Sequence, residues 1–177
     1  MTANLELLNK AKAESTIQKA ILLGITNDRN ILAEVGVSTI RHGQLDHILR
    51  MTIKSLMGLS INDTIDATAR YGSADLRKLI GKLAKQKFGN GEVLLKLQAI
   101  LERARRATDK RNILIHSLWA HELDGKSVIR NKDHTWQTTP KTEEIQALSE
   151  EIVAITTELN RARLDGFLSE AIAKLSK

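Results

Sequence analysis

The 177-residue sequence contains no cysteine, which excludes disulfide bonds, zinc sites built on thiolates and a cysteine nucleophile. Aromatic residues make up only 3% of the chain, too few for a surface on which the bases of single-stranded nucleic acid would stack. There is one proline, the residue that most strongly breaks helices. Hydrophobic residues make up 42% of the chain, enough for a folded core. Because so few of them are aromatic, the core must be mostly aliphatic, and we expect a mainly α-helical protein.

Long apolar runs are also missing. No stretch reaches the roughly 20 apolar residues that a transmembrane helix requires, and residues 1–12 show no signal-peptide pattern. We therefore expect no membrane association, and we expect a soluble protein of the cytoplasm.

Apolar residues recur in steps of three and four along most of the chain, which indicates amphipathic helices. Glycine, asparagine and serine mark the ends between them. We expect helices at residues 4–23, 30–35, 38–57, 60–71, 73–87 and 92–107, a long one beginning at Thr139–Pro140, and a last segment at 167–175. Residues 108–119 either continue the preceding helix or begin a new one. The long helix after Pro140 has a narrow apolar seam that suits packing on other helices or, alternatively, on a second copy.

One short region between these helices has the character of β structure. Residues 119–130 surround Asp124–Gly125, a pair favoured in tight type I′ turns, so we expect a β-hairpin there. Residues 131–138 are expected to form a loop or a ragged strand in which Trp136 is anchored. Since no linker or internal repeat is present, residues 1–177 are expected to form one small helical bundle with a hairpin insertion at about 119–138.

The chain has a formal net charge of +6, which suits a polyanionic partner. The cations that lie close to the motif described next are candidate contacts to RNA: Arg103, Arg105, Arg106 and Lys110. A second group is interpreted as the solvated face of a helix: Arg77, Lys78, Lys82, Lys85 and Lys87.

The most specific pattern in the sequence is Arg111-Asn112, three aliphatic residues and His116. Arginine offers a fixed positive charge and a planar fork of donors that fits a phosphate. Histidine exchanges a proton near neutral pH. Together they suit phosphodiester chemistry that needs no metal. The plainer interpretation is an arginine at a helix start and a histidine bonded within the core.

A helical wheel separates the two charged members of this pattern. Asn112 and His116 share a face, but Arg111 lies about 140° around the helix from His116. The two side chains therefore do not converge on one small group within a single chain. The remainder of a site must come from another element or from a symmetry-related copy, so we expect a homodimer with the 108–120 segment near its axis.

The arginine, the polar residue after it and the histidine four positions further on resemble the signature motif of the HEPN superfamily. That resemblance implies a small HEPN-like helical bundle, often dimeric, in which Arg111, Asn112 and His116 form the active site of a metal-independent endoribonuclease. Such proteins include toxins of toxin–antitoxin modules and phage-defence effectors, so a protein inhibitor of antitoxin type is a further expected partner. Other members bind nucleic acid, nucleotides or proteins without cleaving, and this remains the alternative.

The remaining histidines and carboxylates do not indicate a metal centre. His42 and Asp46 are four residues apart on an expected helix, but two ligands are too few and no HExxH pattern is present. We expect neither a metal nor another cofactor.

Overall fold

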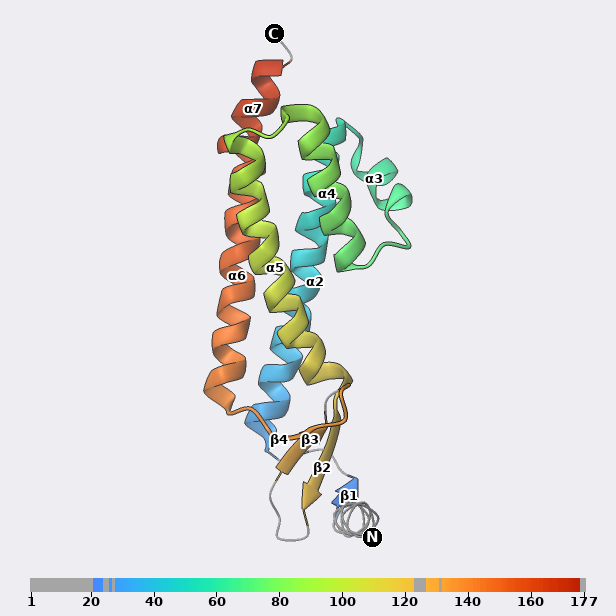
Figure 1. Cartoon of the computed structure of the whole chain (residues 1–177), viewed down its shortest axis with the longest axis vertical. Helices are drawn as coiled ribbons and strands as arrows, with labels where there is room; N and C mark the ends of the chain where they lie inside the picture. The colour runs from blue at the N-terminus through green and yellow to red at the C-terminus, as the bar shows by residue number, and fades with distance from the viewer. Residues whose placement is uncertain (1–20, 24–25, 27, 123–126, 131, 176–177) are drawn as a thin grey trace, which may run out of the picture.

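In the computed structural model the chain is an elongated helical bundle with a small β-sheet at one end (Figure 1). The structure describes residues 21–23, 26, 28–122, 127–130 and 132–175. The main helices are α2 (Arg29–Met57), α4 (Ser73–Phe88), α5 (Glu92–His116) and α6 (Thr142–Leu164). Two shorter helices, α3 (Ile61–Ala67) and α7 (Phe167–Leu175), lie at the end away from the sheet. The mainly α-helical fold expected from the sequence is confirmed.

Helix α2 is continuous, although two helices separated near Gly36 were expected in this region. Asp28 caps it, because its side chain accepts hydrogen bonds from the backbone N–H groups of Asn30 and Ile31. Ser38 is buried inside the helix, where its hydroxyl donates to the Val35 carbonyl, instead of capping a new one. The packing of α2 along its length on α4 and α6 outweighs the local helix-breaking tendency of glycine.

Helix α5 runs without a break through the segment for which the sequence left two possibilities. Thr108 does not act as a cap, since its hydroxyl donates to the carbonyl of Ala104 one turn earlier, at 2.7 Å. The helix ends at His116, and Ser117 has extended backbone angles. The whole motif from Arg111 to His116 therefore lies in the last two turns of one long helix.

Other boundaries differ from expectation by a few residues. Helix α3, expected at residues 60–71, is capped by Ser60 and ends at Ala67, earlier than expected. Gly89 adopts a φ of 65° in the expected turn after α4. Helix α6 begins at Thr142, two residues beyond Pro140, because the Glu144 side chain accepts the backbone N–H of Lys141 and fixes the first turn there.

The described residues form a sheet of four antiparallel strands in the order β1-β2-β3-β4. They are β1 (Ile21–Leu23), β2 (Leu118–Glu122), β3 (Ser127–Arg130) and β4 (Trp136–Thr138). The expected hairpin is confirmed as β2 and β3, while its turn lies outside the described residues. Trp136 is anchored as expected, with the Arg130 guanidinium 5.6 Å from its ring centre. The expected helix at 4–23 is wrong at residues 21–23, which form a strand beside β2, and its other residues are not described.

The core is aliphatic and lies among α2, α4, α5 and α6. The apolar seam of α6 is buried within this single chain, so its packing on other helices explains it without a second copy. None of the helices in the described part of the chain combines the length and the apolar character needed to cross a bilayer.

Candidate functional site

Arg111 and Asn112 line a cavity of about 440 Å³ between α2, α4 and α5. Most of the residues that line it are polar, and besides Arg111 and Asn112 they include Thr39, His42, Asp46, Ser73, Arg77 and Thr108. His116 is exposed at the end of α5 and is not part of this lining. Within one chain the arginine and the histidine of the motif therefore face different surroundings, as the helical wheel predicted.

The guanidinium of Arg111 is only partly satisfied. Its Nη1 donates to the Oδ1 of the adjacent Asn112 at 3.2 Å. Its Nε is buried and has no hydrogen-bond partner among the described residues. A buried donor without a partner costs about 1–3 kcal/mol relative to a paired one. An acceptor that entered the cavity and met this group would recover that energy.

His42 lies against the motif from α2. Its Nε2 is 3.1 Å from the hydroxyl of Thr108. Because the only hydroxyl proton of Thr108 is donated to the Ala104 carbonyl, we infer that Nε2 of His42 is the donor in this contact. Its Nδ1 then faces Asp46 Oδ2 at 3.7 Å.

The environment of His42 favours its neutral form. Burial lowers the pKa of His42 below its ordinary value. The carboxylate of Asp46 opposes this shift, whereas the positive charges of Arg111 and Arg77 add to it. The ring is therefore uncharged near neutral pH, and it adds no positive charge to the cavity.

His42 belongs to a group of neighbouring polar side chains that we call the polar ring, formed by Thr108, His42, Asp46, Ser73 and Arg77. Ser73 donates from its hydroxyl to Asp46 Oδ1 at 2.5 Å. Arg77, one helical turn after Ser73, donates from Nη1 to the Thr108 hydroxyl at 3.1 Å. The polar ring thereby joins α2, α4 and α5 and forms one wall of the cavity.

Thr108 contacts both His42 and Arg77 in the polar ring. Its replacement by valine is expected to lower the free energy of unfolding by about 1–3 kcal/mol. Valine has the same shape but leaves the donors of buried His42 and half-buried Arg77 without their acceptor. Urea unfolding followed by circular dichroism measures the change.

Thr156→Val is the matched control for this variant. Thr156 makes the same local bond, from its hydroxyl to the Ile152 carbonyl at 2.7 Å, and no other side chain depends on it. If Thr108→Val cost no more stability than Thr156→Val, the polar ring would not contribute to the fold.

The four expected RNA-contacting cations fall into two classes. Arg103 pairs with Glu151 and Glu158 on α6, and Arg105 is held by its neighbours Glu102 and Asp109. Arg106 and Lys110 have no ion-pair partner in the described part of the chain. They line a second hollow, of about 690 Å³, whose apolar floor includes Ile113, Leu114, Ile145 and Leu148 between α5 and α6. Arg106 and Lys110 are therefore available to contact a polyanion. Arg103 and Arg105 instead form ion pairs within the chain.

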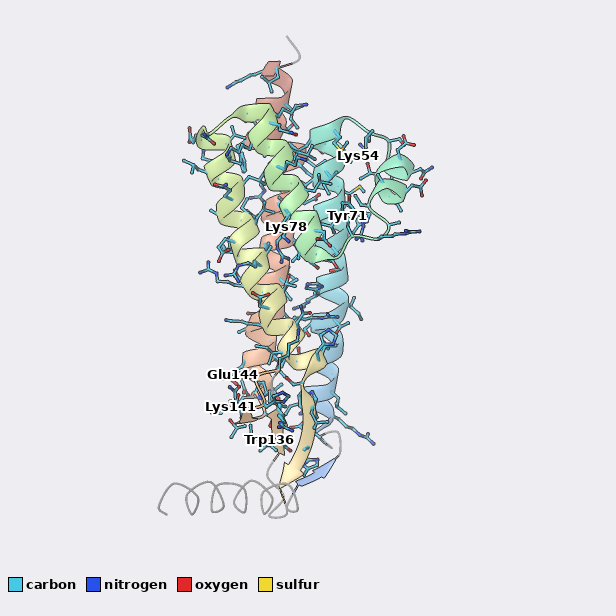
Figure 2. The ribbon with its side chains drawn as sticks, turned by 45° about the vertical axis from the view of Figure 1, so that its right-hand side comes forward. Lys54, Tyr71, Lys78, Trp136, Lys141 and Glu144 are labelled. Carbon is cyan, nitrogen blue, oxygen red and sulfur yellow. The ribbon has the colours of Figure 1, made fainter. Side chains whose placement is uncertain are left out.

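The cations that were expected on a solvated helix face, Arg77, Lys78, Lys82, Lys85 and Lys87, do not all lie in the same surroundings. Lys78 is exposed on α4, as expected for a solvated face (Figure 2). Arg77 instead turns into the cavity beside Thr108, which the sequence analysis missed. His42 and Asp46 are four residues apart in the sequence, but this spacing gave them no expected role. Among the described residues no three histidine, aspartate or glutamate side chains are grouped to hold a metal ion.

Figure 2 also shows Trp136, Lys141 and Glu144 together at the end of the bundle that carries the sheet. The motif histidine ends α5 next to this sheet, because β2 begins at Leu118.

Comparison of the chain with protein-family models, curated proteins and solved structures gives no match.

Proposed function

We propose that the protein is a metal-independent endoribonuclease of HEPN type, with Arg111, Asn112 and His116 as its catalytic residues. The observation that carries this proposal is the unpartnered, buried Nε of Arg111 at a polar cavity, on the same helix as an exposed histidine. A fixed positive charge with free donors is suited to a phosphate, and an accessible imidazole is suited to proton transfer.

The chemistry uses a nucleophile that RNA supplies itself. A base removes the proton of the 2′-hydroxyl, this oxygen attacks the adjacent phosphorus, and the bond to the 5′-oxygen breaks as that oxygen receives a proton. His116 takes the base or the acid role. Arg111 stabilises the charge on the phosphorane, and Asn112 positions Arg111 through their hydrogen bond. The products are a 2′,3′-cyclic phosphate and a 5′-hydroxyl.

A complete site of this kind requires a second copy of the chain. Arg111 lines the cavity and His116 does not, so the histidine that meets one cavity would come from the partner in a homodimer. Exposed apolar side chains beside the motif are consistent with such a contact, since Ile113 is 44% and Leu118 is 45% exposed. In the cell the proposed activity is that of a toxin or phage-defence effector, held in check by a protein inhibitor of antitoxin type.

One observation favours a second candidate function, a non-catalytic module that binds nucleic acid, a nucleotide or a protein. In the single chain His116 is outside the cavity lining, and the histidine that does line it, His42, is buried in the polar ring. A module that only binds would need the cavity and its arginines but no accessible histidine.

Incubation of the purified protein with mixed RNA, with and without EDTA, tests the proposed activity. We expect cleavage at equal rates in both, with 2′,3′-cyclic phosphate ends, because the mechanism places no metal between Arg111 and the phosphate. The preparation must first be shown by mass spectrometry to contain no second protein. Cleavage that EDTA abolishes and a divalent ion restores would refute the mechanism, and no cleavage of any RNA would favour the binding module.

A further inference from the structure

Charged side chains of both signs line the cavity between α2, α4 and α5. Arg77 and Arg111 contribute two positive charges, Asp46 contributes one negative charge, and His42 is neutral. The carboxylate of Asp109 also lines the cavity, and the guanidinium of Arg105 that lies 2.8 Å from it pairs with Glu102 as well. The lining charges therefore sum to about zero, and the two positive charges lie on the guanidinium groups of Arg77 and Arg111.

We propose that this cavity binds one phosphodiester group of an RNA strand between Arg77 and Arg111, with Arg77 as a second phosphate ligand. The proposal deepens the proposed function and takes from it the identity of the strand as RNA. A phosphodiester carries a single negative charge, and its oxygens accept hydrogen bonds from guanidinium groups.

Arg77 is oriented for this role by the polar ring. Its Nη1 is tied to Thr108, a residue of the same helix that carries Arg111. This contact fixes the plane of the guanidinium, and its remaining N–H groups have no hydrogen-bond partner among the described residues. A pre-oriented planar fork loses little conformational freedom when it binds phosphate oxygens. Arg111 lines the same cavity, and its buried Nε also has no hydrogen-bond partner among the described residues.

Two glycines, Gly43 and Gly72, are among the residues that line the cavity. A methyl group added to Gly43 on α2 or to Gly72 before α4 would meet no atom within 4 Å. A larger side chain at Gly43 would therefore project into free space at the cavity wall without removing a charge. Because glycine is a poor helix former, a non-glycine residue at this position within α2 also suits the fold.

The test measures binding of a 2′-O-methyl oligoribonucleotide, which cannot be cleaved through its 2′-oxygen, by fluorescence anisotropy. We expect Arg77→Gln to weaken binding about tenfold or more, as for the loss of a hydrogen bond between charged groups. Lys78→Gln is the matched control, because it removes the same charge from the exposed neighbour on α4 (Figure 2). It should change the affinity by less than about threefold at the same salt concentration.

Gly43→Leu provides a second variant that retains every charge. It should also weaken binding, with an unchanged circular dichroism spectrum. Equal affinities of Arg77→Gln and Lys78→Gln, or undiminished binding by Gly43→Leu, would overturn the proposal. So would displacement of the oligonucleotide by inorganic phosphate at micromolar concentration, since the cavity would then be a site for free phosphate.

These outcomes are separable from those for the proposed function. If the wild type cleaves RNA but Arg77→Gln binds like Lys78→Gln, the nuclease assignment stands and the phosphate site is wrong. If Arg77 and Gly43 control binding of the oligonucleotide but no RNA is cleaved, the phosphate site stands and the nuclease assignment is wrong.

Discussion

Replacement of His116 by alanine is expected to lower the rate of RNA cleavage by about two to four orders of magnitude, the usual contribution of general acid–base catalysis. The fold and most of the RNA affinity should be retained. His116 is exposed, and no hydrogen bond or ion pair holds it among the described residues, so its removal leaves no buried group unpaired. Single-turnover cleavage assays and binding of the 2′-O-methyl oligonucleotide measure the two properties separately.

His47→Ala is a suitable control, since His47 is also an exposed histidine but lies on α2 outside the cavity lining. It should cleave at the wild-type rate. If His116→Ala retained more than about a tenth of the activity, His116 would not be the principal proton donor or acceptor of the reaction.

A mixture of two inactive variants is expected to recover activity. Arg111→Lys keeps the positive charge but loses the planar two-point contact, and its activity should fall by about two to three orders of magnitude. In a dimer formed from one Arg111→Lys chain and one His116→Ala chain, one of the two composite sites contains both native residues. After equal mixing and exchange of subunits, about one quarter of the wild-type activity should return, because half of the dimers are mixed and each has one intact site.

Each variant exchanged with itself under the same conditions is the control for this experiment. A mixture no more active than the sum of its components would show that Arg111 and His116 act within one chain. The site would then require a rearrangement of the last turn of α5, and a composite dimer site would be ruled out.

The sequence was sufficient to predict a helix or strand where its local pattern and the long-range packing favoured the same structure. The apolar steps of α6 and the Asp124–Gly125 hairpin signal were of this kind, and the helix and the two strands are present. The break expected near Gly36 was wrong because a glycine costs only about 1 kcal/mol within a helix. Burial of α2 against two neighbouring helices outweighs that cost, and a single-sequence pattern does not report it.

Some features of the candidate site could likewise be predicted from the sequence, and others could not. The relation between Arg111 and Asn112 follows from their adjacency, and the separation of His116 follows from helix geometry. The approach of Arg77 and His42 to Thr108 joins residues 31 and 66 positions apart in the chain. Their contacts depend on how α2, α4 and α5 cross. In the sequence Arg77 was one of several cations expected to be solvated, and nothing in its neighbours marked it as different.

The join between α5 and β2 has a consequence for control of the protein. Only Ser117 separates the motif histidine from the first residue of β2, and its backbone N–H donates to the Ile113 carbonyl. Trp119 in β2 also donates from its indole N–H to the Leu114 carbonyl at 2.9 Å. The strand and the end of the helix are therefore mechanically continuous, and a shift of the sheet would carry His116 with it. A protein that bound the outer strands β1 or β4 would change the position of His116 without covering the cavity and its arginines.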